Sequence, residues 1–359
     1  MNEYRLAVIG GDGIGPEVMA EALKVLRAVV GSALRLSWDE AEAGAALWQR
    51  TGEDLPKETL ALCQKADAIL FGATGLPDVR YADGTEIAPQ ITLRFALDLY
   101  AGVRPIKLCP GVPSPLAIPP GRTIDYVIFR ENTEGLFASR AGGARVGEAL
   151  AVDSLVVTRA GTERIVRRAF EWCQRRSGAP ADGVRRVTCV DKANMFRSYA
   201  LFRQVFREVA REHPGIDAEC TYVDAMSMYL TQAPWRYDVI VLENMFGDIL
   251  SDLGAATVGG LGMAPSGDIG DRWALFQPSH GTAPDIAGKG IANPIAMILS
   301  TAMLLQWLGD RHADASAGAA AERIEKAVGT ILAAGHAKTR DIGGTAATRE
   351  VGDAVVKAL

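Results

Sequence analysis

The chain has 359 residues, of which 48% are hydrophobic and 23% charged, and its formal net charge is −5. This composition is that of a globular protein and argues against disorder. The negative charge gives no general attraction to nucleic acid or to anionic membranes, and no apolar run approaches the ~20 residues that a membrane span needs. We therefore expect neither kind of partner, and an anionic ligand would have to be bound by a local cluster of basic residues.

The five cysteines are widely spaced and form no CxxC or Cys/His pattern. This favours a reducing compartment over a disulfide framework or a zinc site. The first residues lack the basic start and long apolar stretch of a secretory signal. The sequence thus predicts a cytoplasmic protein.

Short apolar strands alternate with helical patterns along the chain. A strand at 4–9 is followed by a glycine-rich turn and a helix over about 18–30, and a second buried strand ends at residues 68–73. Further strands are predicted at 124–129, 154–158, 186–190 and 239–242, with amphipathic helices such as 162–175 between several of them. This order predicts an α/β fold.

Several segments between these elements are rich in turn-forming residues. The glycine turn at 10–17 resembles a dinucleotide-binding fingerprint, but Pro16 replaces its last glycine, and a generic tight turn remains an alternative. The proline-rich stretch 105–121 predicts a rigid crossing segment and a candidate domain boundary. Residues 139–147 fit either an exposed hairpin or a plain loop. The loop at 277–294 is of a length that is usually functional or disordered.

Two acids, Asp248 and Asp252, lie four residues apart just after a predicted strand. On a helix they would face the same way and repel each other, which makes sense if an oxygen-coordinated cation such as Mg²⁺ or Mn²⁺ lies between them. The alternative is a pair of acids stabilised by the helix dipole. Asp224 is a lone acid in an apolar stretch and needs a partner.

Basic residues stand where an anionic substrate would need them. Arg94, Arg104 and Arg130 suit bidentate carboxylate binding, and Lys192 follows a predicted strand at a position that commonly faces a ligand crevice. For each of them a solvated or ion-paired surface position is the alternative.

Taken together, these segments resemble the β-decarboxylating dehydrogenases, the family of isocitrate, isopropylmalate, homoisocitrate and tartrate/D-malate dehydrogenases. The likeness covers essentially the whole chain. Its motifs are Gly11 to Glu17, Arg94, Arg104, Arg130 to Gly135, Asp191 to Asn194, Asp224 to Met226, Gly247 to Asp252 and His280 to Gly288.

The resemblance implies an isopropylmalate dehydrogenase-like two-domain fold with a non-Rossmann cofactor site. One domain would comprise residues 1–99 and 256–359, and a central domain, 100–255, would carry the dimer interface and an arm near 138–158. The implied assembly is a homodimer with shared active sites, in which Lys192 and Asp224 come from the partner subunit.

The resemblance also implies roles for individual residues. Arg94, Arg104 and Arg130 would bind the substrate carboxylates, and Asp224, Asp248 and Asp252 would hold Mg²⁺ or Mn²⁺. Lys192, assisted by Asp224, would be the catalytic base. The implied cofactor-binding residues are Ile14, His280, Gly281, Thr282, Ala283, Pro284, Asp285, Ile286 and Asn293. The acid at Asp285 predicts NAD, because it would repel the 2′-phosphate of NADP.

Two positions bear on the reaction and its substrate. Phe137 occupies the place of the family's usual tyrosine acid, and phenylalanine has no proton to give, so we expect oxidation to be retained and decarboxylation to be slow or bypassed. Gln90 stands where the family contacts the variable substituent, and its amide favours a small or polar group, as in malate or tartrate. The alternatives are a 3-isopropylmalate dehydrogenase of leucine biosynthesis and a non-catalytic binding protein on the same fold.

Overall fold

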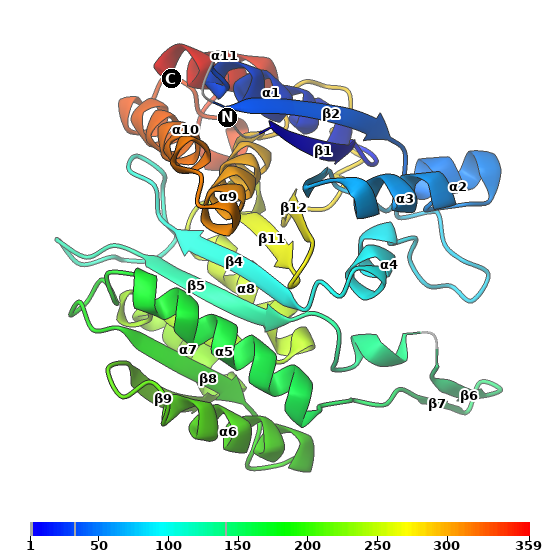
Figure 1. The fold of residues 1–359 in the computed structure, drawn as a ribbon, viewed down its shortest axis with the longest axis vertical. Helices are drawn as coiled ribbons and strands as arrows, with labels where there is room; N and C mark the ends of the chain where they lie inside the picture. Colours follow the sequence, from blue (N-terminus) through cyan, green and yellow to red (C-terminus); the bar gives the residue numbers. More distant parts are fainter. Residues whose placement is uncertain (1–2, 32–33, 141) are drawn as a thin grey trace. The chain divides into compact units, whose positions relative to one another are not determined.

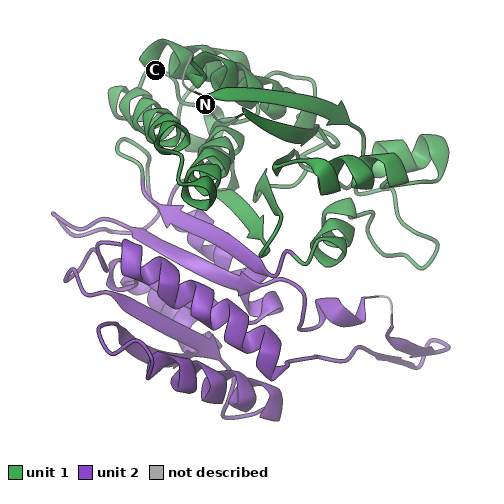
Figure 2. Ribbon diagram, viewed as in Figure 1, with its two compact units in different colours: residues 1–98, 109–113, 259–359 green, residues 99–108, 114–258 purple. Residues whose placement is uncertain are grey.

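The computed structural model describes residues 3–31, 34–140 and 142–359. The chain divides into two compact units, coloured separately in Figure 2. Unit 1 comprises the residues up to 98, residues 109–113 and residues 259–359, and unit 2 comprises residues 99–108 and 114–258. The proline-rich stretch contains two of the points at which the chain passes from one unit to the other.

Unit 1 is built from both ends of the chain (Figure 1). Its elements are β1 (Glu3–Ile9), α1 (Gly15–Val29), β2 (Arg35–Ala41), α2 (Ala45–Thr51), α3 (Lys57–Lys65), β3 (Ala68–Phe71), α4 (Pro89–Ala96), η3 (Leu261–Met263), β11 (Pro265–Ile269), β12 (Ala274–Pro278), α9 (Ile295–His312), α10 (Ala315–Ala334), η4 (Arg340–Ile342) and α11 (Thr348–Ala358). Its strands follow the order β2-β1-β3-β12-β11. All neighbours are parallel except β11, which runs antiparallel to β12.

Unit 2 comprises β4 (Ala101–Lys107), β5 (Asp125–Glu131), η1 (Phe137–Ser139), β6 (Ala144–Val146), β7 (Leu150–Val152), α5 (Arg159–Arg175), β8 (Arg186–Asp191), α6 (Arg197–Ala210), β9 (Asp217–Tyr222), α7 (Val223–Gln232), η2 (Pro234–Arg236), β10 (Val239–Leu242) and α8 (Asn244–Thr257). Its strands follow the order β4-β5-β10-β8-β9, in which only the β4–β5 pair is antiparallel.

Successive side chains of a strand point to opposite faces, and the helices of unit 2 pack against both faces of its strands. Tyr126, Ile128 and Val190 form one buried cluster with residues of α7 and α8. Asp191, the next residue after Val190, points the other way and accepts hydrogen bonds from Arg203 of α6. The predicted α/β class is confirmed, and each face of these strands carries its own pair of helices.

One predicted strand is wrong. Residues 154–158 form no strand: Val156 makes an isolated bridge to Gly135, and Thr158 is the N-cap of α5. The Thr158 hydroxyl accepts a hydrogen bond from the Gly161 backbone at 3.0 Å, so this polar end of the segment starts a helix instead.

The segment 139–147, which the sequence left as hairpin or loop, contains only the first strand of a hairpin: β6 pairs with β7, which follows at Leu150–Val152 (Figure 1). The side chains of this hairpin are exposed, including those of Val146, Leu150 and Val152. Residue 141, inside the predicted arm, lies outside the described residues, as do residues 1, 2, 32 and 33.

Within residues 3–31, 34–140 and 142–359, no helix is both long and apolar enough to cross a bilayer.

Candidate active site

Two of the predicted substrate arginines lie on neighbouring strands and point to the same side. In the β4–β5 pairing Gly102 stands opposite Arg130 and Arg104 stands opposite Ile128, so both arginines face α8. Both are buried, at 6% exposure for Arg104 and 2% for Arg130. Buried guanidinium groups need anionic partners, and this side of the strands supplies them from α8.

Arg130 is held by groups on three sides. Its Nε donates to the buried Asn244 Oδ1 at 2.9 Å, and one terminal nitrogen donates to Asp248. The ring of Phe137 lies 5.1 Å from its guanidinium carbon, which is cation–π distance. The Asn244 amide nitrogen in turn donates to the Glu134 backbone oxygen at 3.0 Å. Asn244 therefore orients the arginine, a role that sequence reasoning missed.

The acid pair on α8 shares this environment. Asp248 is about half exposed and Asp252 is one turn further along the helix. Burial and the nearby negative charge of Asp248 raise the pKa of Asp252, whereas Arg104 and Arg130 act to lower it. Two repelling carboxylates flanked by two arginines have the donor chemistry of a site for Mg²⁺ or Mn²⁺ and an anionic ligand.

Lys192 and Asp224 form a second cluster. The Lys192 ammonium donates to Asp224 Oδ1 at 2.6 Å, and this hydrogen bond lowers the pKa of the Asp224 carboxyl. The Asp224 side chain is 66% exposed, so it is not the buried acid that its apolar neighbours suggested, and its partner is a lysine. Among the described residues no group of three His, Cys, Asp or Glu side chains is arranged to hold a metal ion. A single chain thus brings Asp248 and Asp252 together without Asp224.

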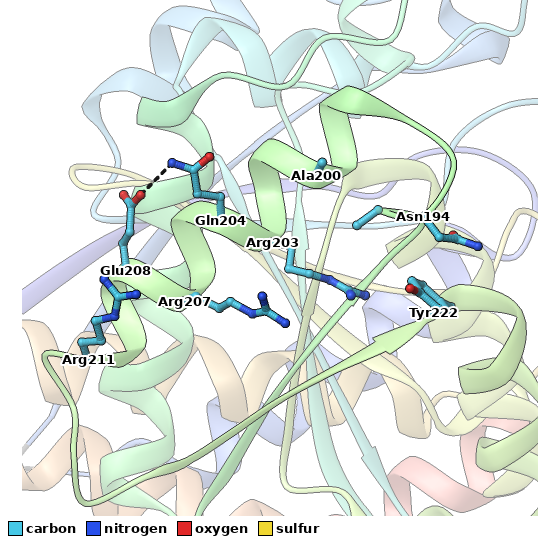
Figure 3. Close-up of a pocket in the computed structure, with 9 residues that line it drawn as sticks. Asn194, Ala200, Arg203, Gln204, Arg207, Glu208, Arg211 and Tyr222 are labelled. Atoms are coloured by element: carbon cyan, nitrogen blue, oxygen red, sulfur yellow. Dashed lines mark hydrogen bonds between the residues drawn. The ribbon is translucent and has the colours of Figure 1, made fainter.

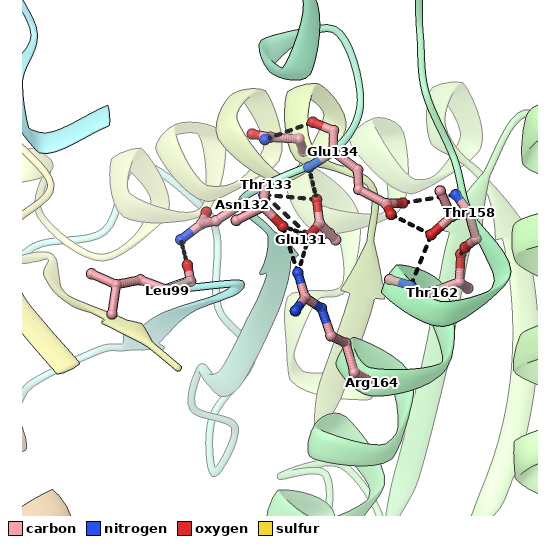
Figure 4. Close-up of polar contacts among 10 residues, drawn as sticks. Leu99, Glu131, Asn132, Thr133, Glu134, Thr158, Thr162 and Arg164 are labelled. Carbon is pink, nitrogen blue, oxygen red and sulfur yellow. Dashed lines mark hydrogen bonds and ion pairs between the residues drawn. The ribbon is translucent and has the colours of Figure 1, made fainter. Parts of the chain in front are cut away.

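Polar contacts fix the loop that follows Arg130 (Figure 4). The buried Glu131 carboxylate accepts from the backbone nitrogens of Thr133 and Glu134 and lies 4.0 Å from Arg164. Burial raises the pKa of Glu131 to about 7, against the lowering effect of these hydrogen bonds. Glu134 accepts from the Thr158 backbone nitrogen at 2.8 Å and so ties the loop to the start of α5.

In unit 1, Arg94 is buried and oriented by a residue far along the chain. Its Nε donates to Asp268 Oδ2 at 2.9 Å, and Gln277 donates to the same oxygen at 3.0 Å. Asp268 was missed, because β11 has the sequence PSGDI, and only the structure shows that the strand is buried and its lone acid needs a partner. The predicted substituent contact Gln90 is half-buried, and its Oε1 accepts from the Thr74 hydroxyl at 2.6 Å.

The glycine-rich turn of unit 1 packs against the predicted cofactor loop. The Ile14 backbone nitrogen donates to the Thr282 carbonyl at 2.9 Å. Gly13 has a φ of +57°, and a Cβ there would lie 2.2 Å from that same oxygen, so only glycine fits. Asp12 accepts from the backbone nitrogens of Ala45, Ala46 and Gly75. The turn is thus a structural junction beside the loop.

The loop itself offers polar groups to a ligand. His280 has its Nδ1 2.9 Å from the Gly281 oxygen, while its buried Nε2 has no hydrogen-bond partner among the described residues. Burial lowers the His280 pKa. Gly281, Pro284 and Asp285 are exposed and Thr282 is buried, while Ala283 has a φ of +38° and Ile286 is half-buried. An orphaned ring nitrogen and an exposed carboxylate on one loop fit a dinucleotide, with the carboxylate available for ribose hydroxyls.

Asn293 is committed to internal bonds. Its Oδ1 accepts from the Ile295 backbone nitrogen at 3.0 Å, and its Nδ2 donates to Asp341 at 2.9 Å. It thereby fixes the turn that leads into α9, whose N-cap is Pro294.

Comparison with known proteins gives a consistent result over the whole chain. The family model for isocitrate/isopropylmalate dehydrogenase matches residues 5–355. The chain is 43% identical over 355 residues to a 3-isopropylmalate/3-methylmalate dehydrogenase of Methanocaldococcus jannaschii, covering 99% of this chain and 98% of the relative. It is 42% identical over 363 residues to a 3-isopropylmalate dehydrogenase of Zymomonas mobilis, covering 99% of each.

Solved structures agree with this assignment. The crystal structure of isocitrate dehydrogenase from Methylococcus capsulatus superposes with a TM-score of 0.87 at 38% identity, covering 99% of each chain. The predicted fold class is confirmed by this likeness. The chain is therefore an NAD-dependent oxidoreductase that acts on a CH–OH group with Mg²⁺ or Mn²⁺, and it belongs to the isocitrate/isopropylmalate dehydrogenase family.

Proposed function

We propose that the chain oxidises a malate-type 2-hydroxy acid whose 3-substituent is small or polar, with NAD as the hydride acceptor and decarboxylation as a following step. The proposal rests on one observation: Arg104 and Arg130, on the side of β4 and β5 that faces α8, lie near Asp248 and Asp252. A carboxylate clamp next to an acid pair suits an anionic substrate with an oxygen-bound cation.

The residues of the chain divide the work as follows. Arg94, Arg104 and Arg130 bind substrate carboxylates, and Asp248 and Asp252 hold the divalent metal, joined by Asp224 of a second copy. When bound, the metal lowers the pKa of the substrate hydroxyl. Lys192, oriented by Asp224, takes the hydroxyl proton. His280 and Asp285 bind the cofactor from the unit 1 loop.

Phe137 limits the last step, the delivery of a proton to carbon after loss of carbon dioxide. Its ring contacts Arg130, so it lies beside the proposed carboxylate clamp with no hydroxyl to donate. Because an enolate that is not protonated can recombine with carbon dioxide, we expect early release of carbon dioxide to lag behind NADH formation, with a β-keto acid that can be trapped. In Phe137→Tyr the two yields should become equal. A one-to-one yield with no trapped β-keto acid in the unmodified enzyme would contradict this.

Gln90 supports the choice of substituent. The Thr74 hydroxyl fixes its amide oxygen, and among the described residues its amide nitrogen has no hydrogen-bond partner, so two amide hydrogens are left that an isopropyl group would not satisfy. The second candidate is 3-isopropylmalate, favoured by the names of the relatives. The test is a panel of malate, tartrate, 3-methylmalate, isocitrate, homoisocitrate and 3-isopropylmalate stereoisomers with NAD and Mn²⁺. The highest kcat/KM for 3-isopropylmalate would refute a small or polar substituent.

We further propose that the active unit is a homodimer with shared sites. Exposed apolar side chains support this on three elements of unit 2: Met228 and Tyr229 on α7, Ile249 on α8, and the β6–β7 hairpin. Such a surface is typical of an interface between copies. The cytoplasmic location stays a prediction.

Asp285 is the proposed selector of NAD. We expect Asp285→Asn to raise the kcat/KM ratio of NADP to NAD by about tenfold or more, because the change removes a negative charge that repels the 2′-phosphate. Steady-state kinetics with both cofactors measure the ratio. A control variant, Asp310→Asn, removes an exposed charge from the end of α9 and should leave the ratio unchanged. An unaltered ratio in Asp285→Asn would remove the residue from cofactor selection.

A further inference from the structure

A hollow of about 570 Å³ lies along α6 in unit 2 (Figure 3). We call it the α6 hollow. Its main lining residues are Asn194, Arg203, Arg207, Glu208, Arg211 and Tyr222. It is separate from the clamp on the α8 side, because Asp191 and Arg203 lie on the opposite face of β8 from the cluster that includes α7 and α8.

Three arginines line the hollow at four-residue intervals. Arg203 and Arg207 lie in α6, and Arg211 is the residue at its end, still in helical conformation. This spacing places all three on one side of the helix, where like charges one turn apart repel. The repulsion is small because Arg207 and Arg211 are exposed, but an anion placed in the hollow would be attracted by all three arginines.

The carboxylates nearby compensate only part of this charge. Arg203 forms two hydrogen bonds, of 2.7 and 2.8 Å, with the fully buried Asp191. Glu208 pairs with Arg159 of α5 and accepts from Gln204 at 2.9 Å. Within the described residues neither Arg207 nor Arg211 has an ion pair, whereas Arg167 on α5 pairs with two glutamates. Arg207 instead hydrogen-bonds the Cys220 thiol, and the charge of Arg211 lowers the pKa of Glu208 without an ion pair, so positive side chains outnumber negative ones in the lining of the hollow.

The positive charge at the hollow affects the pKa of a nearby thiol, that of Cys220. Cys220 of β9 stands opposite Cys189 of β8 and follows the same alternation as Tyr222. A hydrogen bond with Cys189, together with Arg203 and Arg207, lowers the pKa of Cys220 to about 7. Three other cysteines show the opposite effect, because burial raises the pKa of Cys63, Cys173 and Cys189. The hollow thus stabilises negative charge at a neighbouring atom.

We propose that the α6 hollow is a binding site for a compact oxyanion of the phosphate class, held between Arg207 and Arg211. A tetrahedral anion offers oxygens to two guanidinium groups one helical turn apart, whereas the two coplanar oxygens of a single carboxylate are matched by one arginine. The site does not depend on the proposed substrate. Asn194, which lines the hollow, lies two residues from Lys192, so occupancy bears on the loop that carries the proposed base.

The first test measures binding of inorganic phosphate to the full chain by calorimetry. We expect Arg207→Gln/Arg211→Gln to weaken binding at this site by at least about tenfold, the loss of two charge-assisted contacts. The control Arg272→Gln/Arg349→Gln removes the same charge from exposed positions of unit 1 and should bind as the unmodified chain does. Arg211→Gln alone provides a milder variant.

Alkylation of Cys220, followed by mass spectrometry at pH 7, identifies the site that is occupied. Phosphate should slow the reaction by about two- to fivefold, because it offsets the charge that keeps the thiol ionised. The effect should vanish in Arg207→Gln/Arg211→Gln and persist in the control. The proposal is overturned if phosphate does not slow the alkylation of Cys220 in the unmodified chain. It is also overturned if malate at the same concentration slows the alkylation equally.

Discussion

Mixed dimers that carry Lys192→Met in one chain and Asp248→Asn in the other should retain about half of the wild-type activity, although each variant alone is inactive. If a site takes its lysine from one chain and its acid pair from the other, one of the two sites in such a dimer has both native residues, and the other has neither. The Lys192–Asp224 pair and the Asp248–Asp252 pair form separate clusters in one chain, which is the arrangement this result requires.

The matched control places both substitutions in the same chain. A dimer of Lys192→Met/Asp248→Asn with an unmodified chain should be inactive, since each site then lacks one residue. Co-expression with two different affinity tags allows both dimers to be purified, and NADH formation is followed at 340 nm. The reverse pattern, an inactive first dimer and a half-active control, would show that each chain has a complete site of its own.

The sequence identified most of the charged residues of the site but not the residues that orient them. Asp224 was recognised as an acid without a local partner, and Lys192 as a strand-end lysine, yet nothing in their spacing of 32 residues joined them. Asn244 and Asp268 hold Arg130 and Arg94 across 114 and 174 residues. Such contacts depend on which strand faces which helix, and a local pattern does not contain that information.

The same limit explains the errors in local structure. The segment 154–158 has the apolar character of a strand, but its backbone finds a single bridge to Gly135 and its last residue caps α5. The arginine stripe of α6 can be seen in the sequence as a four-residue repeat. The sequence does not show which of these arginines is paired, because the contacts of Asp191 and Glu208 form only in the folded chain.

Gly247→Ala is expected to lower kcat/KM for the hydroxy acid by about a hundredfold, the scale of loss when a positioning contact moves by about 1 Å. A Cβ at this position of α8 would lie 2.5 Å from Arg130 Cγ and 2.6 Å from its Cβ. Those atoms are next to the backbone of β5, so the arginine has to move as a whole. Its hydrogen bonds with Asn244 and Asp248 would be lost or distorted.

Gly329→Ala is the matched control, because Gly329 lies within α10 and a Cβ there meets nothing within 4 Å. Replacing a helical glycine by alanine should raise stability by about 0.5–1 kcal/mol and leave the kinetics unchanged. Gly247→Ala should instead lose stability by about 1–3 kcal/mol, the range for overpacking. Denaturant titration and steady-state kinetics on both variants separate the two effects. A Gly247→Ala enzyme with unaltered kcat/KM would mean that the position of Arg130 does not control substrate binding, since the backbone leaves no room for both the added methyl group and the observed side chain.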